Sequence, residues 1–305
     1  MNTKSRVVLV TGATGNQGGG VARALLRSGH RVRAFVRDPG SAPAGTLATA
    51  GCEIEIGAFE DEERPAAALE GVDAVFSVQR PDLDNSNSER RHGFALVDAA
   101  RHAGVRHFIH SSVCQLDDHE RFPRWNEGYW SVSYWTDKQA VEDRINAAGF
   151  DAVTILRPSF IMENFCRGKA QVLFPQLKGG VLVTPILPGS LVQLIAADDI
   201  GAFAAAAVAD PASYAGEVIE LAGDALKIDE IAAILSEVTH STIKARSVPA
   251  EDAIAAGLPA GWVRSQEWIN DVGYHVDEAQ LSKYPVALTS FRAWATAHRD
   301  ALLAP

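Results

Sequence analysis

Residues 6–23 read RVVLVTGATGNQGGGVAR, and this stretch predicts the fold of the whole chain. Val7 to Val10 form a short apolar run that is typical of a strand buried on both faces. Five glycines follow within residues 11–20, and an apolar spacing typical of a helix begins at Val21. A strand, a glycine-rich turn and a helix start, in that order, are what the pyrophosphate of a dinucleotide requires. The stretch therefore predicts a nucleotide-binding site.

The turn is spaced GxxGxxG rather than GxGxxG, and each of its glycines has a separate expected role. The first is expected to take the tight turn, the second to let the backbone approach the phosphates, and the third to let helix and strand pack closely. The N–H groups at the helix start then face the anion. A flexible turn without a ligand is the alternative. The predicted cofactor-binding residues of the turn are Gly12, Thr14, Gly15, Asn16, Gln17 and Gly18.

The composition is that of an ordinary globular protein, with 47% of the 305 residues hydrophobic and 22% charged. The formal net charge is −10 and no long cluster of Lys and Arg occurs, so we expect binding neither to nucleic acid nor to a membrane surface. No run approaches the length of a membrane span, and the first strand begins too early for a signal peptide. The three cysteines are far apart and form no CxxC, which favours a reduced cytoplasmic protein. The nine histidines are scattered, and we expect no metal site.

Strand-like runs alternate with helical patterns through the first half of the chain. This order favours an α/β fold, a Rossmann-type doubly wound parallel sheet with a smaller C-terminal α+β lobe. We expect an NADP(H)-binding domain over 1–156 and a substrate or partner lobe over 157–305, and leave open that the two interleave. The expected strands are Val7–Val10, Val32–Val36, Cys52–Ile56, Ala74–Val78, His107–His110 and Ala152–Leu156, and the expected helices span about 17–28, 64–70, 88–103 and 136–148.

Ligands of such a sheet bind along the carboxyl ends of its strands, so the residues that follow each strand are informative. Arg37 follows the second strand, 19 residues beyond Gly18, where an NAD site would carry an acidic residue. A guanidinium suits the 2′-phosphate of NADP(H), which we therefore favour over NAD(H). The alternative is a solvated Arg37 paired with Asp38.

The later strand ends supply further predicted cofactor contacts. Ala58 and Phe59 follow the third strand, where backbone and ring packing would hold the adenine. Gln79 and Arg80 follow the fourth strand at the nicotinamide side, with a plain surface loop as the alternative. Ser111 ends the fifth strand.

Past the sixth strand, Pro158, Ser159 and Phe160 are expected over the nicotinamide face, and Glu163 and Asn164 toward the substrate. A capped turn into the second lobe is the alternative for each of these residues. Asp198 or Asp199 is expected to cap the alanine-rich helix that follows them.

Tyr134 and Lys138 are four residues apart, so on a helix they lie on one face, one turn from each other. A buried phenol beside an ammonium is expected to favour its anionic form. Such a tyrosine exchanges a proton with a carbonyl oxygen near neutral pH. We therefore predict Tyr134 and Lys138 as the catalytic pair, and Lys138 also as a contact of the nicotinamide ribose. The aromatic segment 114–133 before them is expected to be a lid or a pocket wall, or simple packing.

Three segments of the chain together resemble the NmrA-like family of atypical short-chain dehydrogenases. They read TGATGNQGGGVARALL, RAFVRDP and DKQAVEDRINAAGFDAVTILRPSFIMENF. The resemblance implies a Rossmann domain that binds NADP(H) and a smaller lobe that closes a cleft. Some members reduce quinones or other carbonyl-type acceptors, and others are redox sensors that regulate partner proteins. Relatives among the phenylpropanoid reductases use the lysine of the equivalent helix as the acid–base group, a role that falls here on Lys138.

One position departs from the pattern of active extended short-chain dehydrogenases. The fifth strand ends Ser111-Ser112-Val113, so a valine stands where their substrate-orienting Ser or Thr is usual. The leading hypothesis is an NADPH-dependent oxidoreductase acting on a small carbonyl, quinone or activated double bond in the cleft between the lobes. The alternatives are a non-catalytic NADP(H)-sensing regulator with a protein partner, and an isomerase or lyase without net redox chemistry.

Overall fold

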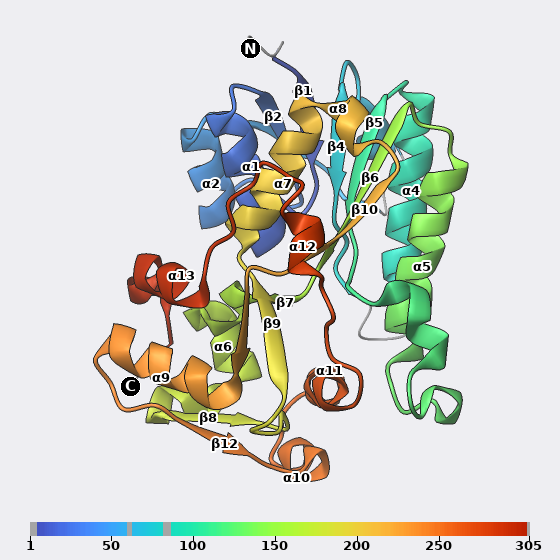
Figure 1. The fold of residues 1–305 in the computed structure, drawn as a ribbon. Helices are drawn as coiled ribbons and strands as arrows, with labels where there is room; N and C mark the ends of the chain where they lie inside the picture. Colours follow the sequence, from blue (N-terminus) through green and yellow to red (C-terminus); the bar gives the residue numbers. More distant parts are fainter. Residues whose placement is uncertain (1–4, 60–62, 82–86, 304–305) are drawn as a thin grey trace.

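A parallel sheet of seven strands forms the centre of the molecule, in the order β10-β6-β5-β4-β1-β2-β3 (Figure 1). The computed structural model describes residues 5–59, 63–81 and 87–303. The strands of this sheet are β1 (Val7–Val10), β2 (Arg31–Val36), β3 (Glu53–Ile56), β4 (Ala74–Ser77), β5 (His107–Ser111), β6 (Ala152–Pro158) and β10 (Glu217–Leu221). The doubly wound α/β fold predicted from the sequence is confirmed.

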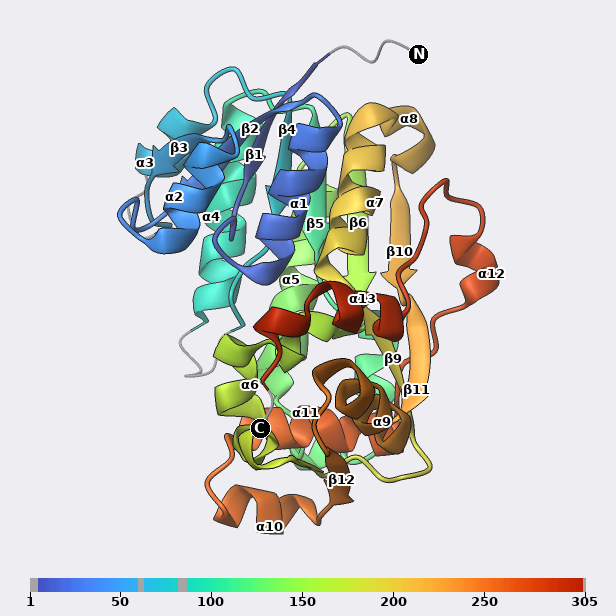
Figure 2. The same ribbon diagram turned by 90° about the vertical axis from the view of Figure 1, so that its left-hand side faces the viewer.

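Helices cover both faces of the sheet because its strands are apolar on both sides. One face packs against α1 (Asn16–Arg27), α2 (Ala42–Thr49) and α7 (Ala197–Ala209). The other packs against α3 (Glu63–Ala68), α4 (Ser88–His102) and α5 (Val132–Ala147). The carboxyl ends of the strands point toward the smaller part of the molecule (Figure 2).

Two glycines let α1 and α7 cross with their backbones in contact. A Cβ atom on Gly20 would lie 2.4 Å from the carbonyl oxygen of Ala197, and one on Gly201 would lie 2.5 Å from that of Gly20. The sheet also takes β10 from the second half of the chain, in parallel register with β6. The two halves of the sequence therefore share this sheet and the core between it and helices α1 and α7.

The smaller part lies beyond the carboxyl edge of the sheet and has its own aromatic core. It contains a three-stranded sheet, β11-β9-β7, and a two-stranded sheet, β12-β8. Its strands are β7 (Phe160–Ile161), β8 (Val181–Thr184), β9 (Leu191–Ile195), β11 (Asp224–Lys227) and β12 (Lys244–Ser247). The remaining helices of the second half are α6 (Arg167–Leu173), α8 (Pro211–Tyr214), α9 (Ile228–Thr239), α10 (Ala250–Ala255), α11 (Ala260–Asp271), α12 (Glu278–Leu281) and α13 (Phe291–Ala297).

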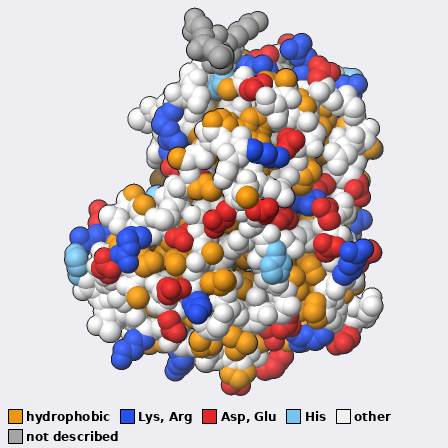
Figure 3. Space-filling view, in the orientation of Figure 1, with side chains coloured by type: hydrophobic (Ala, Val, Ile, Leu, Met, Phe, Trp, Pro, Cys, Tyr) orange, Lys and Arg blue, Asp and Glu red, His pale blue; other side chains and the backbone are white. Residues whose placement is uncertain are grey.

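Most elements predicted with residue ranges, all in the first half of the chain, lie within one or two residues of the observed ones. Helix α2 was not predicted, and α5 begins at Val132 rather than at 136. Acidic and basic side chains are interspersed over the face drawn in Figure 3. Within the described ranges, no helix is both long enough and apolar enough to cross a bilayer.

Candidate cofactor and active site

The glycine turn between β1 and α1 leaves backbone donors at the helix start. Gly12 adopts a φ of 59°, which its lack of a side chain permits, and its carbonyl accepts a hydrogen bond from Gly15 N–H at 2.8 Å. Gly19 N–H makes the first helical bond, to the Gly15 carbonyl at 2.9 Å. The three amides between them, of Asn16, Gln17 and Gly18, therefore have no acceptor within the helix. A helix start of this kind can bind a phosphate.

Gly18 is packed against the turn that it follows. A Cβ atom there would lie 2.4 Å from the Gly12 carbonyl oxygen and 2.6 Å from that of Thr11. Only glycine fits this approach without a backbone shift. At the same place Ser111, at the end of β5, donates a hydrogen bond to Gln17 Oε1 at 2.5 Å. Two predicted cofactor residues from distant parts of the chain are thus in contact.

A cavity of about 390 Å³ lies beside this turn, between residues of the two halves of the chain. Thr14, Gly15 and Asn16 line it from one side. The lining from the other side is Glu163, Cys166, Asp198 and His298, with Arg23 of α1 completing it. The lining residues do not include Tyr134 or Lys138, which lie on α5, across the sheet from α1 and α7.

Glu163 has a structural partner that the sequence did not indicate. Its carboxylate accepts hydrogen bonds from Ala197 N–H at 3.1 Å and from the Trp294 indole at 2.9 Å, and burial raises its pKa. It therefore occupies the N-terminus of α7, where an acidic group is favourable. The expectation that Asp198 or Asp199 caps this helix is wrong.

The two aspartates make tertiary contacts instead. Asp198 pairs with Arg23 of α1 at 2.6 Å, and Asp199 accepts bonds from the backbone and hydroxyl of Thr289. The ion pair of Asp198 with Arg23 thereby adds to the contact between α1 and α7. Asp199 anchors the C-terminal segment.

Arg37 lies just beyond β2 and is exposed. It forms no ion pair with any described residue, and Asp38 instead accepts a hydrogen bond from Gly40 N–H at 2.9 Å. The Arg37–Asp38 pairing considered from the sequence is thus not observed. Beyond β3, Ala58 is half-buried, and Phe59 packs on Phe35 and His92 with ring centroids 5.4 and 5.3 Å apart. Contact of Arg37, Ala58 and Phe59 with a cofactor stays a prediction.

The residues after β4 differ in their surroundings. Gln79 is buried and donates to Ser77 Oγ at 2.9 Å, while its own Oε1 has no partner among the described residues. Ser77 Oγ lies 3.2 Å from His110 Nδ1, and burial lowers the pKa of His110 to about 3. Arg80 is exposed, and the loop residues 82–86 lie outside the described part of the chain.

Tyr134 and Lys138 share one face of α5, as the sequence indicated. Lys138 Nζ lies 4.9 Å from the centroid of the Tyr134 ring and 2.6 Å from Glu89 Oε1 of α4. Burial by itself would lower the pKa of Lys138, but the Glu89 carboxylate outweighs it, and the pKa is raised. The lysine is therefore an ammonium at neutral pH.

The expectation that Tyr134 favours its anionic form is wrong. Burial raises the pKa of its phenol, and Glu89 adds to this effect, while the Lys138 ammonium opposes it without overcoming it. The ammonium is already neutralised by a carboxylate, so it stabilises a phenolate less than an unpaired cation would. The raised pKa therefore favours the neutral phenol of Tyr134 at neutral pH.

Val113, at the position where active relatives usually carry Ser or Thr, lies in apolar surroundings. Val113 belongs to the buried cluster of the smaller part that also contains Phe122 and Trp135. Ser112 is buried, and its hydroxyl has no partner among the described residues. After β6, Pro158 is buried and Phe160 packs on Phe165 and Trp262, with ring centroids 5.8 and 5.7 Å apart. Contact of Pro158 and Phe160 with a nicotinamide ring stays a prediction.

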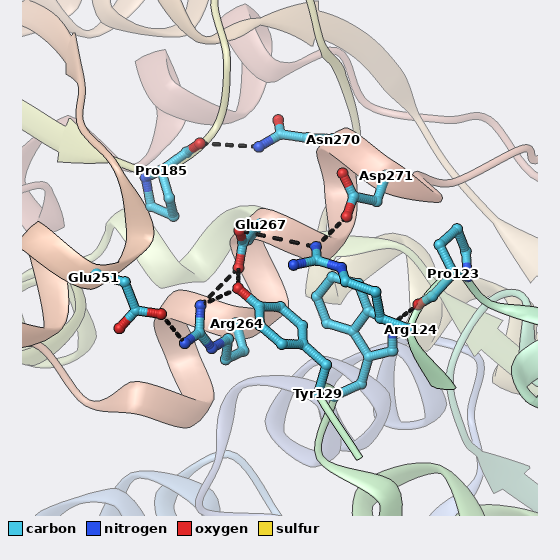
Figure 4. A network of polar contacts seen from close by, with 10 residues as sticks. Pro123, Arg124, Tyr129, Pro185, Glu251, Arg264, Glu267, Asn270 and Asp271 are labelled. Atoms are coloured by element: carbon cyan, nitrogen blue, oxygen red, sulfur yellow. Dashed lines mark hydrogen bonds and ion pairs between the residues drawn. The ribbon is translucent and has the colours of Figure 1, made fainter. Parts of the chain in front are cut away.

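The aromatic segment 114–133 is joined to α11 by hydrogen bonds, ion pairs and cation–π contacts. Figure 4 shows Tyr129 between two guanidiniums, with Arg124 at 3.6 Å and Arg264 at 4.2 Å from its ring centroid. Its hydroxyl donates to Glu267 at 2.7 Å, and Arg124 pairs with Asp271. Of the readings open from the sequence, these contacts favour a fixed wall over a mobile lid.

Glu89 is a charged partner of Lys138 that the sequence did not indicate. It lies 49 positions before Lys138, and only the packing of α4 on α5 brings the two together. The sequence does place Glu89 in the first turn of a predicted helix. An acidic residue is common there because it interacts favourably with the helix dipole, so its position alone did not indicate a partner.

The sheet order, the glycine turn and the edge cavity define a Rossmann-type protein with a dinucleotide-type site. The model of the NmrA-like family matches residues 4–284, and the chain belongs to this family. It is 29% identical over 273 residues to the NmrA-like family domain-containing oxidoreductase hkm9 of Aspergillus hancockii, covering 82% of this chain and 77% of that protein.

Two further proteins resemble this chain over most of their length. An NAD(P)H azoreductase of Xenophilus azovorans is 30% identical over 260 residues, covering 83% of this chain and 82% of the relative. The crystal structure of Citrobacter sp. triphenylmethane reductase complexed with NADP(H) superposes with a TM-score of 0.76 at 23% identity, covering 97% of this chain and 100% of that one. The structural likeness establishes the shared fold.

Proposed function

We propose that this protein is an NADPH-dependent oxidoreductase that reduces a small carbonyl compound, a quinone or an activated double bond. The observation that carries the proposal is the phosphate-type glycine turn at the carboxyl end of β1, where the end of β5 is hydrogen-bonded to the turn through Ser111 and Gln17. The Tyr134–Lys138 pair on α5, the helix that follows β5, adds a candidate proton donor. Its relatives named as an oxidoreductase and as an azoreductase support the same class of reaction.

The residues at the sheet edge fit NADPH. The amides of Asn16, Gln17 and Gly18 have no helical acceptor and would bind the pyrophosphate. Arg37 is exposed and unpaired among the described residues, so its guanidinium is available to the 2′-phosphate. Lys138 would reach the nicotinamide ribose. When bound, NADPH supplies the hydride.

The chain's own residues would supply the proton and orient the acceptor. The Tyr134 phenol is protonated at neutral pH and can donate to a developing oxyanion. The Lys138 ammonium stabilises negative charge on that phenol as the proton leaves. Val113 cannot add a second hydrogen bond, so the substrate would be oriented by the wall of segment 114–133 and α11.

Val113 also favours a second candidate, a non-catalytic NADP(H)-sensing regulator that binds a protein partner. Sensing requires that the two redox states of the cofactor differ in their affinity for a partner or for a conformation of the protein.

The test is NADPH oxidation, followed at about 340 nm, with panels of quinones, aldehydes, ketones and enones. The oxidoreductase predicts turnover that falls about a hundredfold or more in Lys138→Ala and Tyr134→Phe, the usual scale of a lost proton donor. Turnover that both variants retain would refute the roles given to these residues. Absence of turnover with every acceptor, combined with a partner retained only in the presence of NADPH or of NADP⁺, would support the regulator instead.

A further inference from the structure

Two adjacent ion pairs join the N-terminal halves of α4 and α5. Glu89 Oε1 lies 2.6 Å from Lys138 Nζ, and Arg90 Nη2 lies 3.0 Å from Asp137 Oδ1. The side chains of Glu89 and Lys138 are 3% and 6% exposed, whereas that of Arg90 is 40% exposed. The first pair is therefore withdrawn from water, and the second reaches the surface.

A buried lysine depends on its partner to remain charged. Burial disfavours an ammonium by several pKa units, and an opposite charge within about 4 to 6 Å restores it. The structure contains this competition at Lys138, where burial acts against the charge and Glu89 restores it.

The other groups around Lys138 do not replace Glu89. Arg157 binds Glu142 through two hydrogen bonds, at 3.1 and 2.7 Å, and binds Asp117 as well. Glu142 therefore has a cation of its own, and its effect in raising the pKa of Lys138 is smaller than that of Glu89. His110 is neutral above a pKa of about 3, and Tyr134 is a neutral phenol. The titratable groups that act directly on Lys138 are Glu89 of α4, Tyr134 and Glu142 of α5, and His110 of β5. The groups that act on these neighbours are Arg157 of β6, Asp117, Cys114 and Tyr274.

We propose that Glu89 is the positioning residue of Lys138: it fixes the ammonium at the nicotinamide side of the sheet edge and keeps it a permanent hydrogen-bond donor. This inference rests on the proposed function for the identity of the cofactor. Glu89 touches neither cofactor nor substrate in this role and acts only through the lysine.

The experiment is a titration of NADPH into wild type, Glu89→Gln and Arg90→Gln between pH 7 and pH 9.5, followed by nicotinamide fluorescence. Wild-type affinity should show no loss that is due to Lys138 over this range, because its pKa lies above the ordinary value. In Glu89→Gln the lysine pKa should fall by about 1 to 3 units or more. NADPH affinity should then fall about tenfold as the pH rises, because a charge-assisted hydrogen bond is lost.

Arg90→Gln is the matched control, because it removes the neighbouring helix–helix pair and leaves Glu89 in place. It should keep the wild-type pH profile. A flat profile in Glu89→Gln overturns the proposal, and so does the same new pH dependence in Arg90→Gln, which would show a general loosening of α4 from α5. Thermal melting of each variant establishes that it is folded.

If Glu89→Gln does not fold, Glu89→Asp provides the test. Aspartate keeps the negative charge, but its side chain is one methylene shorter, so the carboxylate lies further from Lys138. NADPH should therefore bind more weakly at every pH, with no new pH dependence. Unchanged affinity would overturn the proposal. A wild type that binds NADPH but reduces no acceptor would refute the proposed activity alone, whereas a wild type that does not bind NADPH refutes both.

Discussion

Replacing Gly18 by alanine tests the glycine turn directly, because the added atom would meet backbone. Its Cβ would lie 2.4 and 2.5 Å from the oxygen and carbon of the Gly12 carbonyl and 2.6 Å from the Thr11 oxygen. Ordinary van der Waals contact begins about 1 Å further out, and no side-chain rotation relieves the overlap. The turn and α1 must therefore move apart.

The magnitude follows from two opposing effects. Overpacking in a rigid site costs about 1–3 kcal/mol, and replacing glycine by alanine in a helix returns up to about 1 kcal/mol. We expect Gly18→Ala to lower the free energy of unfolding by about 1–2 kcal/mol. Displacing the donors at the start of α1 should also weaken NADPH binding at least about tenfold, the effect of one charge-assisted hydrogen bond.

Urea denaturation and NADPH titration measure both effects, and Gly45→Ala is the control. Gly45 lies in α2, and nothing lies within 4 Å of the position its Cβ would take. That variant should gain about 0.5–1 kcal/mol and bind NADPH normally. If Gly18→Ala matched wild type in stability and in affinity, the close packing assigned to this turn would be refuted.

Two further predictions concern the packing around the site. Tyr129→Phe should lower the free energy of unfolding by about 1 kcal/mol. It removes the hydroxyl that links Arg264 and Glu267 but keeps the ring between the guanidiniums. Equal urea midpoints for the variant and the wild type would count against this link. Burial lowers the pKa of His107 to about 4 and of His110 to about 3, so the unfolded chain binds more protons below pH 6.5. Stability should therefore fall as the pH drops from about 6.5 toward 4, and His110→Gln should flatten this dependence; an unchanged slope would contradict it.

The first half of the fold was predictable because each part of it has a local cause. The apolar run Val7–Val10 is the observed β1, and the glycines after α1 and α4, Gly29 and Gly104, adopt the positive φ expected of helix ends. Helix α2 was missed because its sequence, APAGTLAT, contains a proline and a glycine and only two buried residues.

The chemistry of the candidate site was less predictable, because it depends on contacts between distant residues. The spacing of Tyr134 and Lys138 placed them on one face, but the protonation of the tyrosine depends on burial and on Glu89, which α4 supplies. The cap of α7 comes from Glu163, 34 residues earlier, and not from the aspartates in its first turn. Local sequence does not encode either pairing.

The central claim is that a nucleotide lies over the glycine turn with its 2′-phosphate at Arg37. The most direct measurement is the ratio of NADH to NADPH dissociation constants in wild type, Arg37→Ala and the exposed-arginine control Arg121→Ala. The account predicts that wild type and the control prefer NADPH, and that Arg37→Ala loses about tenfold or more of this preference by weakening NADPH binding alone. An unchanged ratio in Arg37→Ala, or an equal loss of affinity for both cofactors, would contradict it.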